Sequence, residues 1–244
     1  MKIWSLLAII MASCYRPLKL MRARKRNIVG FEFACYSSSG NTWRESDVDN
    51  FKVINEDIVY NGFRKVVRRD VVFPSGRTSS FDVLSQGAPS TAVFVWNTVN
   101  STATLLREYY PGTNMVMYGC VGGIYESDKH ESMLVCAQSE LEEEAQLSSR
   151  LWYPLVEGGN GIPFDKYSDS YLHPYLALDC SPVLDPKPMD TSEWIVVEND
   201  IPYSQLMDLL RKGSMTLPCA YAVVLGIRKV KELGYALPNN SASW

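Results

Sequence analysis

The sequence lacks the close cysteine and histidine pairs that hold structural zinc, and it has no long hydrophobic run. Its 244 residues include six cysteines and only two histidines, and no two cysteines form a C-x-x-C pair. A zinc site usually needs such a pair, so we expect mostly buried thiols in a reducing compartment instead. The longest apolar stretch, residues 3–12, is about half of what a membrane helix needs, so no transmembrane span is expected.

Basic residues are scarce outside one end of the chain. Residues 1–31 contain seven Lys and Arg and no acidic residue, whereas residues 32–244 contain 17 basic and 27 acidic residues. The body is therefore acidic. Because a surface that follows phosphates has to be basic, we expect no nucleic-acid partner.

The basic N-terminal segment allows three interpretations. Residues 1–31 have the composition of an organelle transit peptide, which would direct the chain to a plastid or mitochondrion. The apolar stretch after Lys2 also suits a secretory signal, although the positive charge that follows it disfavours export. The third interpretation is an unprocessed extension of a cytoplasmic protein. In each case residues 1–42 are expected to form a basic tail, and residues 236–244 a flexible C-terminal tail.

The body begins with strand-like segments and ends with helical ones. Alternating apolar and polar residues predict strands. These strands cover residues 51–60, 64–73, 79–86, 90–97, 102–110, 115–121, 175–180 and 193–199. Helices are predicted over residues 131–147, 203–212 and 219–233. The order predicts an α+β fold, with N-terminal antiparallel strands over residues 43–86 and a main domain over residues 87–235.

The first predicted helix carries a cluster of carboxylates. At 100° per residue, Glu140, Glu143 and Glu144 share one arc of this helix, beside an apolar stripe that includes Leu141 and Ala145. Neighbouring carboxylates repel one another, and a cluster of hard oxygen ligands is what Mg²⁺ or Mn²⁺ requires. A Glu-rich helix is also commonly just a solvated face. The pattern by itself leaves both interpretations open.

The same segment resembles the second half of the Nudix box, G-x5-E-x7-R-E-U-x-E-E-x-G-U, in which U is aliphatic. Glu131 lies eight residues before Ser139, which stands at the box Arg, and residues 140–147 supply the E, U, E, E and U positions. Outside the box, three further segments resemble the ADP-ribose and ADP-sugar pyrophosphatase branch; these are residues 73–77, 107–111 and 121–123. The resemblance spans roughly residues 52–230. It implies a Nudix α/β/α sandwich with a mixed central sheet.

This resemblance implies divalent-metal-dependent hydrolysis of the diphosphate bond in a nucleoside diphosphate linked to a sugar. The substrate would be of the ADP-ribose or ADP-sugar type, and the products AMP and a sugar phosphate. The implied catalytic residues and ligands of Mg²⁺ or Mn²⁺ are Glu140, Glu143 and Glu144, with the backbone carbonyl of Gly122 as a further ligand. The candidate substrate-binding residues are Arg107, Arg77 and Arg69. A homodimer is plausible, because the resembling branch commonly pairs through its N-terminal strands.

Departures from the box leave other functions open. Ser139 replaces the box Arg, Gln146 replaces the closing Gly, and seven residues rather than five separate Gly123 from Glu131. The main alternative is therefore a catalytically impaired Nudix-fold module that binds a nucleotide or a partner. Hydrolysis of a non-nucleotide diphosphate is a third hypothesis. The general base is either one of the helix glutamates or a later acid, namely Glu157, Asp165 or Asp169. His130 is expected to be a solvated loop residue.

Overall fold

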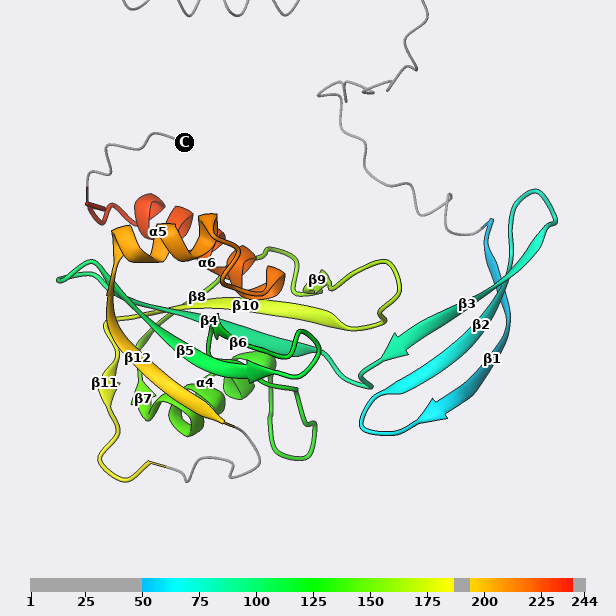
Figure 1. Cartoon of the computed structure of the whole chain (residues 1–244), viewed down its shortest axis with the longest axis horizontal. Coiled ribbons are helices and arrows are strands. Elements are labelled where there is room, and N and C mark those ends of the chain that lie inside the picture. Colours follow the sequence, from blue (N-terminus) through cyan, green and yellow to red (C-terminus); the bar gives the residue numbers. More distant parts are fainter. Residues whose placement is uncertain (1–49, 187–193, 239–244) are drawn as a thin grey trace, which may run out of the picture. The chain divides into compact units, whose positions relative to one another are not determined.

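The strand-like segments at the start of the body form a small antiparallel sheet in the computed structural model, which describes residues 50–186 and 194–238 (Figure 1). Its order is β1 (Lys52–Asn61), β2 (Lys65–Val72) and β3 (Thr78–Ser85). Gly76, in the turn between β2 and β3, has a φ of 81°, which glycine tolerates best. The predicted tail over residues 1–42 lies outside the described residues, as do residues 239–244 of the C-terminal tail.

A second, larger sheet contains both parallel and antiparallel neighbours. Its main path is β12 (Ile195–Pro202), β5 (Thr102–Tyr110), β4 (Ser90–Asn97), β10 (Tyr171–Leu178) and β8 (Leu151–Pro154). In addition, β6 (Met115–Gly119) pairs with β5, and β9 (Ile162–Pro163) pairs with β10. The β4–β10 pair is parallel and the others are antiparallel. The two-residue strands β7 (Leu147–Ser148) and β11 (Ser181–Pro182) pair separately.

Helices cover both faces of the larger sheet, and alternate residues of β4 reach the two layers. Phe94 and Trp96 pack in the layer that includes α5 (Tyr203–Arg211) and α6 (Leu217–Glu232). Val93 and Val95 pack in the layer of α4 (Met133–Ala145). The fold is therefore an α/β/α sandwich with a mixed central sheet, preceded by a strand-rich segment. This confirms the α+β class expected from the sequence.

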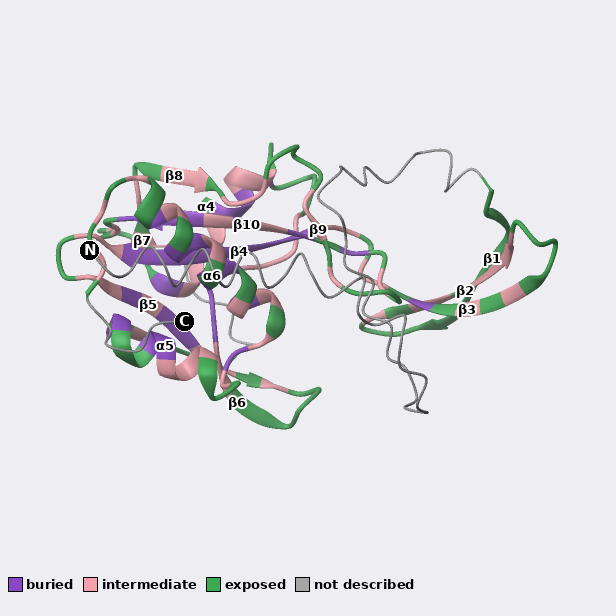
Figure 2. Cartoon of the chain, turned by 90° about the horizontal axis from the view of Figure 1, so that it is seen from above, coloured by how far each residue is buried: buried purple, intermediate pink, exposed green. Residues whose placement is uncertain are grey.

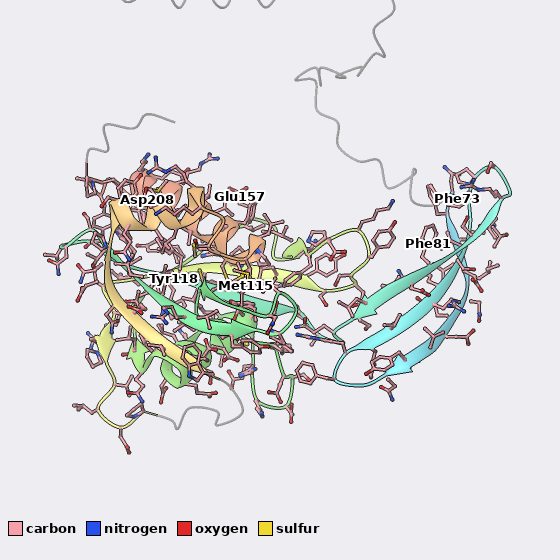
Figure 3. The ribbon with its side chains drawn as sticks, in the orientation of Figure 1. Phe73, Phe81, Met115, Tyr118, Glu157 and Asp208 are labelled. Atoms are coloured by element: carbon pink, nitrogen blue, oxygen red, sulfur yellow. The ribbon has the colours of Figure 1, made fainter. Side chains whose placement is uncertain are left out.

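The small N-terminal sheet buries far less of itself than the larger sheet does. All ten residues of β1 are exposed, and Val83 is the one buried residue among β1, β2 and β3 (Figure 2). Phe73 and Phe81 provide an aromatic contact across it, with ring centroids 6.2 Å apart (Figure 3). The backbone of Leu84 joins β3 to the loop before β10, because its N–H donates to the Tyr167 carbonyl at 2.7 Å.

No helix in the described part of the chain has the length and apolarity needed to cross a bilayer.

Candidate active site

Helix α4, which carries the acidic cluster, begins and ends at residues that cap it. Ser132 is the N-cap, and its hydroxyl accepts a hydrogen bond from the Val135 N–H at 3.2 Å. Gln146 is the C-cap in the left-handed conformation, with a φ of 56°, and its N–H donates to the carbonyl of Glu142. The box has glycine at this position. The left-handed helix end is therefore kept here without glycine.

The three glutamates of the cluster line a single cavity of about 570 Å³. The segment just after β6 forms the wall opposite them, and two glycines allow it to pack closely. A Cβ on Gly123 would overlap the Glu140 carboxylate, and a Cβ on Gly122 would overlap the Thr91 carbonyl. The glycine pair before the helix therefore has a steric role at this site.

Two of the glutamates are fixed by hydrogen bonds. Glu144 Oε2 accepts from the Gly122 N–H at 2.8 Å. Glu143 Oε1 accepts from the Ser139 hydroxyl at 3.2 Å, one helical turn away. Ser139, which replaces the box Arg, thus contacts the cluster directly.

The carbonyl of Gly122 faces the same side as its N–H. The residues on either side of Gly122 accept backbone hydrogen bonds from Val93 at 2.7 Å and Thr91 at 2.8 Å, so this segment runs extended beside β4. In an extended backbone the N–H and C=O of one residue point the same way. Because the Gly122 N–H points to Glu144, its carbonyl also faces the acids.

The cluster has the oxygen donors that a Mg²⁺ or Mn²⁺ site needs, but its carboxylates are not gathered around one point. Three carboxylates and one backbone carbonyl are hard oxygen donors, which both cations prefer. Within residues 50–186 and 194–238, no three His, Cys, Asp or Glu side chains are gathered closely enough to hold a metal ion. Metal binding by Glu140, Glu143, Glu144 and Gly122 therefore stays a prediction that requires the carboxylates to move together.

Four charged residues that the sequence interpretation missed line the same cavity. Two are basic, Arg64 and Lys129, and two are acidic, Glu108 and Glu126. Lys129 Nζ lies 2.8 Å from Glu126 Oε1, and both residues belong to the lengthened loop before the helix. The extra loop length was the sequence signal for Lys129 and Glu126, whereas Arg64 precedes β2 and Glu108 belongs to β5.

Arg107, the first predicted substrate ligand, does not line this cavity. Its guanidinium forms an ion pair with Glu198 of β12, with Nη1 and Oε1 3.1 Å apart. Successive residues of a strand point to opposite faces, and it is the next residue, Glu108, that reaches the cavity.

The other two predicted substrate arginines lie in β2 and in the turn between β2 and β3, and they also do not line the cavity. Arg69 Nε lies 2.6 Å from Glu56 Oε1. The Arg77 guanidinium lies over the Phe73 ring, 4.9 Å from its centroid. A substrate-binding role for these arginines remains a prediction.

None of the three later acids lines the cavity that contains the helix glutamates. Glu157 belongs to a separate hollow beside α6 (Figure 3). Asp165 accepts a hydrogen bond from the Tyr167 N–H at 2.5 Å, and Asp169 lines another hollow near Gly87. The helix glutamates are therefore better placed than these acids to act as a base.

The expectation of a solvated His130 is wrong. This residue is only 7% exposed, and its Nδ1 accepts a hydrogen bond from the Glu126 N–H at 3.1 Å. Its ring also packs on Tyr125, with centroids 5.9 Å apart. The extra loop residues form a turn that buries the imidazole.

Two cysteines form another part of the cavity wall. The Cys120 N–H donates to Cys219 Sγ at 3.2 Å, and the Cys120 thiol contacts the Cys219 carbonyl oxygen at 3.8 Å. Hydrogen bonding from the Cys120 thiol lowers the pKa of Cys219 to about 7, although burial acts in the opposite direction. The pKa of Cys120 is raised by the same contact and by burial.

Comparisons with known proteins support the fold. No protein-family model matches the sequence, and no curated protein matches it. The chain is similar to a solved structure described as the crystal structure of an ADP compounds hydrolase, with 22% sequence identity and a TM-score of 0.64. The match covers 77% of this chain and 97% of the other. At this identity the likeness shows the fold alone, which is Nudix-like.

Proposed function

We propose that this chain is a Nudix-type pyrophosphatase. In this proposal it hydrolyses the diphosphate bond of a nucleoside diphosphate linked to a sugar and depends on Mg²⁺ or Mn²⁺. An ADP-ribose or ADP-sugar type of substrate would yield AMP and a sugar phosphate. The observation that carries the proposal is the cavity in which Glu140, Glu143 and Glu144 face the Gly122 backbone. A fold shared with an ADP compounds hydrolase adds support.

The residues of the cavity suit the parts of this reaction. Glu140, Glu143, Glu144 and the Gly122 carbonyl would hold the cation, which when bound neutralises diphosphate charge and makes water more acidic. The Gly122 N–H and the Ser139 hydroxyl orient two of the carboxylates. One helix glutamate accepts the proton of the attacking water, since the later acids lie elsewhere.

The basic and aromatic residues of the cavity suit a nucleoside diphosphate. Lys129 and Arg64 line the cavity and would provide positive charge for the diphosphate once Lys129 leaves its ion pair with Glu126, whereas the predicted arginines at positions 107, 77 and 69 lie outside the cavity. Phe63, next to Arg64, lines the cavity and is 95% exposed. The Arg64 guanidinium lies over this ring, 5.3 Å from its centroid, so a base would stack on the ring's other face.

A catalytically impaired nucleotide-binding module is the alternative, and one observation favours it. The acids are not gathered into a metal-binding group among the described residues, and Glu143 and Glu144 already accept hydrogen bonds. If these contacts persist in the presence of Mg²⁺, the cavity would bind a nucleotide without turnover.

The test is a product assay on the full chain with Mg²⁺. ADP-ribose, ADP-glucose, NADH, coenzyme A and geranyl diphosphate are incubated separately with wild type and with a Glu143→Gln, Glu144→Gln double variant. We expect AMP from ADP-ribose or ADP-glucose, and a loss of rate of at least about 10²-fold in the double variant, because two ligands lose their charge. Glu142→Gln is the matched control, because Glu142 lies on the same helix and does not line the cavity.

The remaining outcomes of this assay would favour another function or refute the role of the helix acids. No product from any compound, with Mg²⁺ binding still measurable by calorimetry, would replace the enzyme with the binding module. Hydrolysis of geranyl diphosphate or coenzyme A alone would favour the non-nucleotide hypothesis. Equal AMP release by wild type and the double variant would refute the role of the helix acids.

A further inference from the structure

Two cysteines far apart in the sequence meet beside the acidic cavity. Cys120 directly follows β6, and Cys219 lies in the first turn of α6. The two elements are tied together next to this point, because the Tyr118 N–H donates to the Ser214 carbonyl at 3.0 Å and Tyr118 forms a β-bridge with Met215. These backbone contacts hold Cys120 and Cys219 close together.

The two cysteines contact each other directly and also reach the cavity. Cys219 Sγ lies 3.2 Å from the backbone nitrogen of Cys120, and Cys120 Sγ lies 3.8 Å from the Cys219 carbonyl oxygen. Cys120 is 7% exposed and Cys219 is 8% exposed, yet both line the cavity of about 570 Å³. A small oxidant that enters the cavity can therefore reach them, whereas large reagents are hindered.

The environment of Cys219 favours its thiolate. The Cys120 N–H donates to its sulfur at 3.2 Å, and its position in the first turn of a 16-residue helix places it at the positive end of the helix dipole. The thiolate, and not the thiol, is the nucleophile in sulfur chemistry.

The other two cysteines of the described ranges, Cys136 and Cys180, have neither access to the cavity nor an environment that favours the thiolate. Burial raises the pKa of both the Cys136 and the Cys180 thiols to about 12. Cys136 is fully buried, and neither residue lines the cavity that contains the acidic cluster. They therefore provide internal controls for cysteine reactivity.

We propose that Cys219 and Cys120 form an oxidation site, at which a peroxide converts the two thiols to a disulfide on the cavity wall. The Cys219 thiolate attacks one peroxide oxygen, an S–O bond forms as the O–O bond breaks, and the released hydroxide takes up a proton to give water. The Cys120 sulfur then attacks the Cys219 sulfenic acid. An S–S bond replaces the S–O bond, and the oxygen leaves with the Cys120 proton as a second water.

The oxidation balances as two thiols and one hydrogen peroxide giving one disulfide and two waters. Each sulfur loses one electron and each peroxide oxygen gains one. Each sulfur already lies beside a backbone atom of the other cysteine, so the two side chains start close to each other. The product links the end of β6, two residues before Gly122, to α6.

The experiment is peptide mapping of the full chain after brief treatment with hydrogen peroxide. Remaining thiols are alkylated, the protein is cleaved with trypsin, and the peptides are identified by mass. We expect peptides 108–129 and 213–228 to appear as one species that is two hydrogens lighter than their sum and is separated by dithiothreitol. Cys219 should lose its free thiol at least about 10-fold faster than Cys180.

Cysteine variants and treatment in urea test whether the cross-link is specific to Cys120 and Cys219. Cys180→Ser is the matched control and should keep the cross-link, whereas Cys219→Ser should abolish it and leave Cys120 open to alkylation. Treatment in urea should remove the preference for this pair, because the backbone contacts that create it are lost.

Three results would overturn the proposal. These are free thiols at positions 120 and 219 after treatment, sulfinic acid at Cys219 without a cross-link, and preferred linkage of Cys219 to Cys14 or Cys35. The wild-type map does not depend on whether a variant folds. It also does not measure hydrolysis, so its failure is separate from failure of the proposed function.

Discussion

The larger sheet and the N-terminal sheet differ in how much of their apolar surface the described residues bury. The larger sheet is covered by helices on both faces, and seven successive residues of β4 are buried. In the N-terminal sheet all ten residues of β1 are exposed, including the apolar side chains of Val53, Ile54 and Ile58. The larger sheet has its own core, and the N-terminal sheet lacks a covering layer among the described residues.

This difference shows where the described residues bury their own apolar surface and where they leave it exposed. The acids depend on α4, which packs on the larger sheet, so their placement follows from the well-packed region. The N-terminal sheet presents an apolar surface and an edge strand, which proteins usually cover. The homodimer expected from the sequence resemblance would cover it, and this expectation remains to be tested.

The largest expected effect is on stability. Leu141→Ala, at a fully buried site in α4, should lower the free energy of unfolding by about 2–5 kcal/mol at any protein concentration. Ile58→Ala, at a residue 60% exposed in β1, should cost less than about 1 kcal/mol in dilute solution, and more at concentrations where a dimer forms. Urea unfolding at two protein concentrations measures both. A loss for Ile58 as large as that for Leu141 in dilute solution would show that β1 belongs to a core of this chain.

The next largest effect is on hydrolysis, and it tests how precisely the Glu140 carboxylate has to be positioned. Gly123→Ala should lower the rate of diphosphate hydrolysis by about 10²-fold, because the added Cβ displaces the Glu140 carboxylate. Gly112→Ala is the matched control, since a Cβ at that position meets no atom within 4 Å. Initial rates of AMP release measure the difference. Equal rates in both variants would mean that Glu140 is dispensable.

A third change tests the covering of the exposed sheet. Ile58→Lys should shift the protein from dimer to monomer in sedimentation velocity, because a charge would enter the apolar surface. Val99→Lys, at a similarly exposed apolar residue in the turn between β4 and β5, should leave the dimer intact. A wild-type monomer at high protein concentration would refute the expected homodimer.

The smallest expected effect is at the start of α4. Ser132→Ala removes the hydroxyl that caps the Val135 N–H, so the free energy of unfolding should fall by about 1 kcal/mol. Urea unfolding of wild type and the variant measures the difference. No loss would show that the packing of α4 on the sheet suffices to hold its first turn.

Much of this fold could be predicted from periodicity. The alternating segments became strands within a few residues of their predicted ends, and the helix predicted over residues 131–147 is α4 at Met133–Ala145. The helical spacing of the acids also explains why all three line one cavity. The short strands β7, β8, β9 and β11 escaped prediction, because two to four residues carry no detectable period.

Contacts between distant residues could not be predicted. Nothing local in the sequence connects Arg107 with Glu198, or Cys120 with Cys219, because each pair depends on which strands and helices become neighbours. The burial of His130 and the approach of Lys129 to the cavity depend on how the extra loop residues turn. Loop conformation and pairing were thus available only from the structure.

The Mg²⁺ dependence of ADP-ribose hydrolysis tests most directly whether the cavity acids of α4 form an active site. It is measured in three full-length proteins, namely wild type, Glu144→Gln and Glu142→Gln. We expect that Glu144→Gln needs a higher Mg²⁺ concentration and loses at least about 10²-fold in maximal rate, while Glu142→Gln matches wild type. Equal Mg²⁺ dependence and equal rates in all three proteins would contradict the claim that the cavity acids of α4 form the active site.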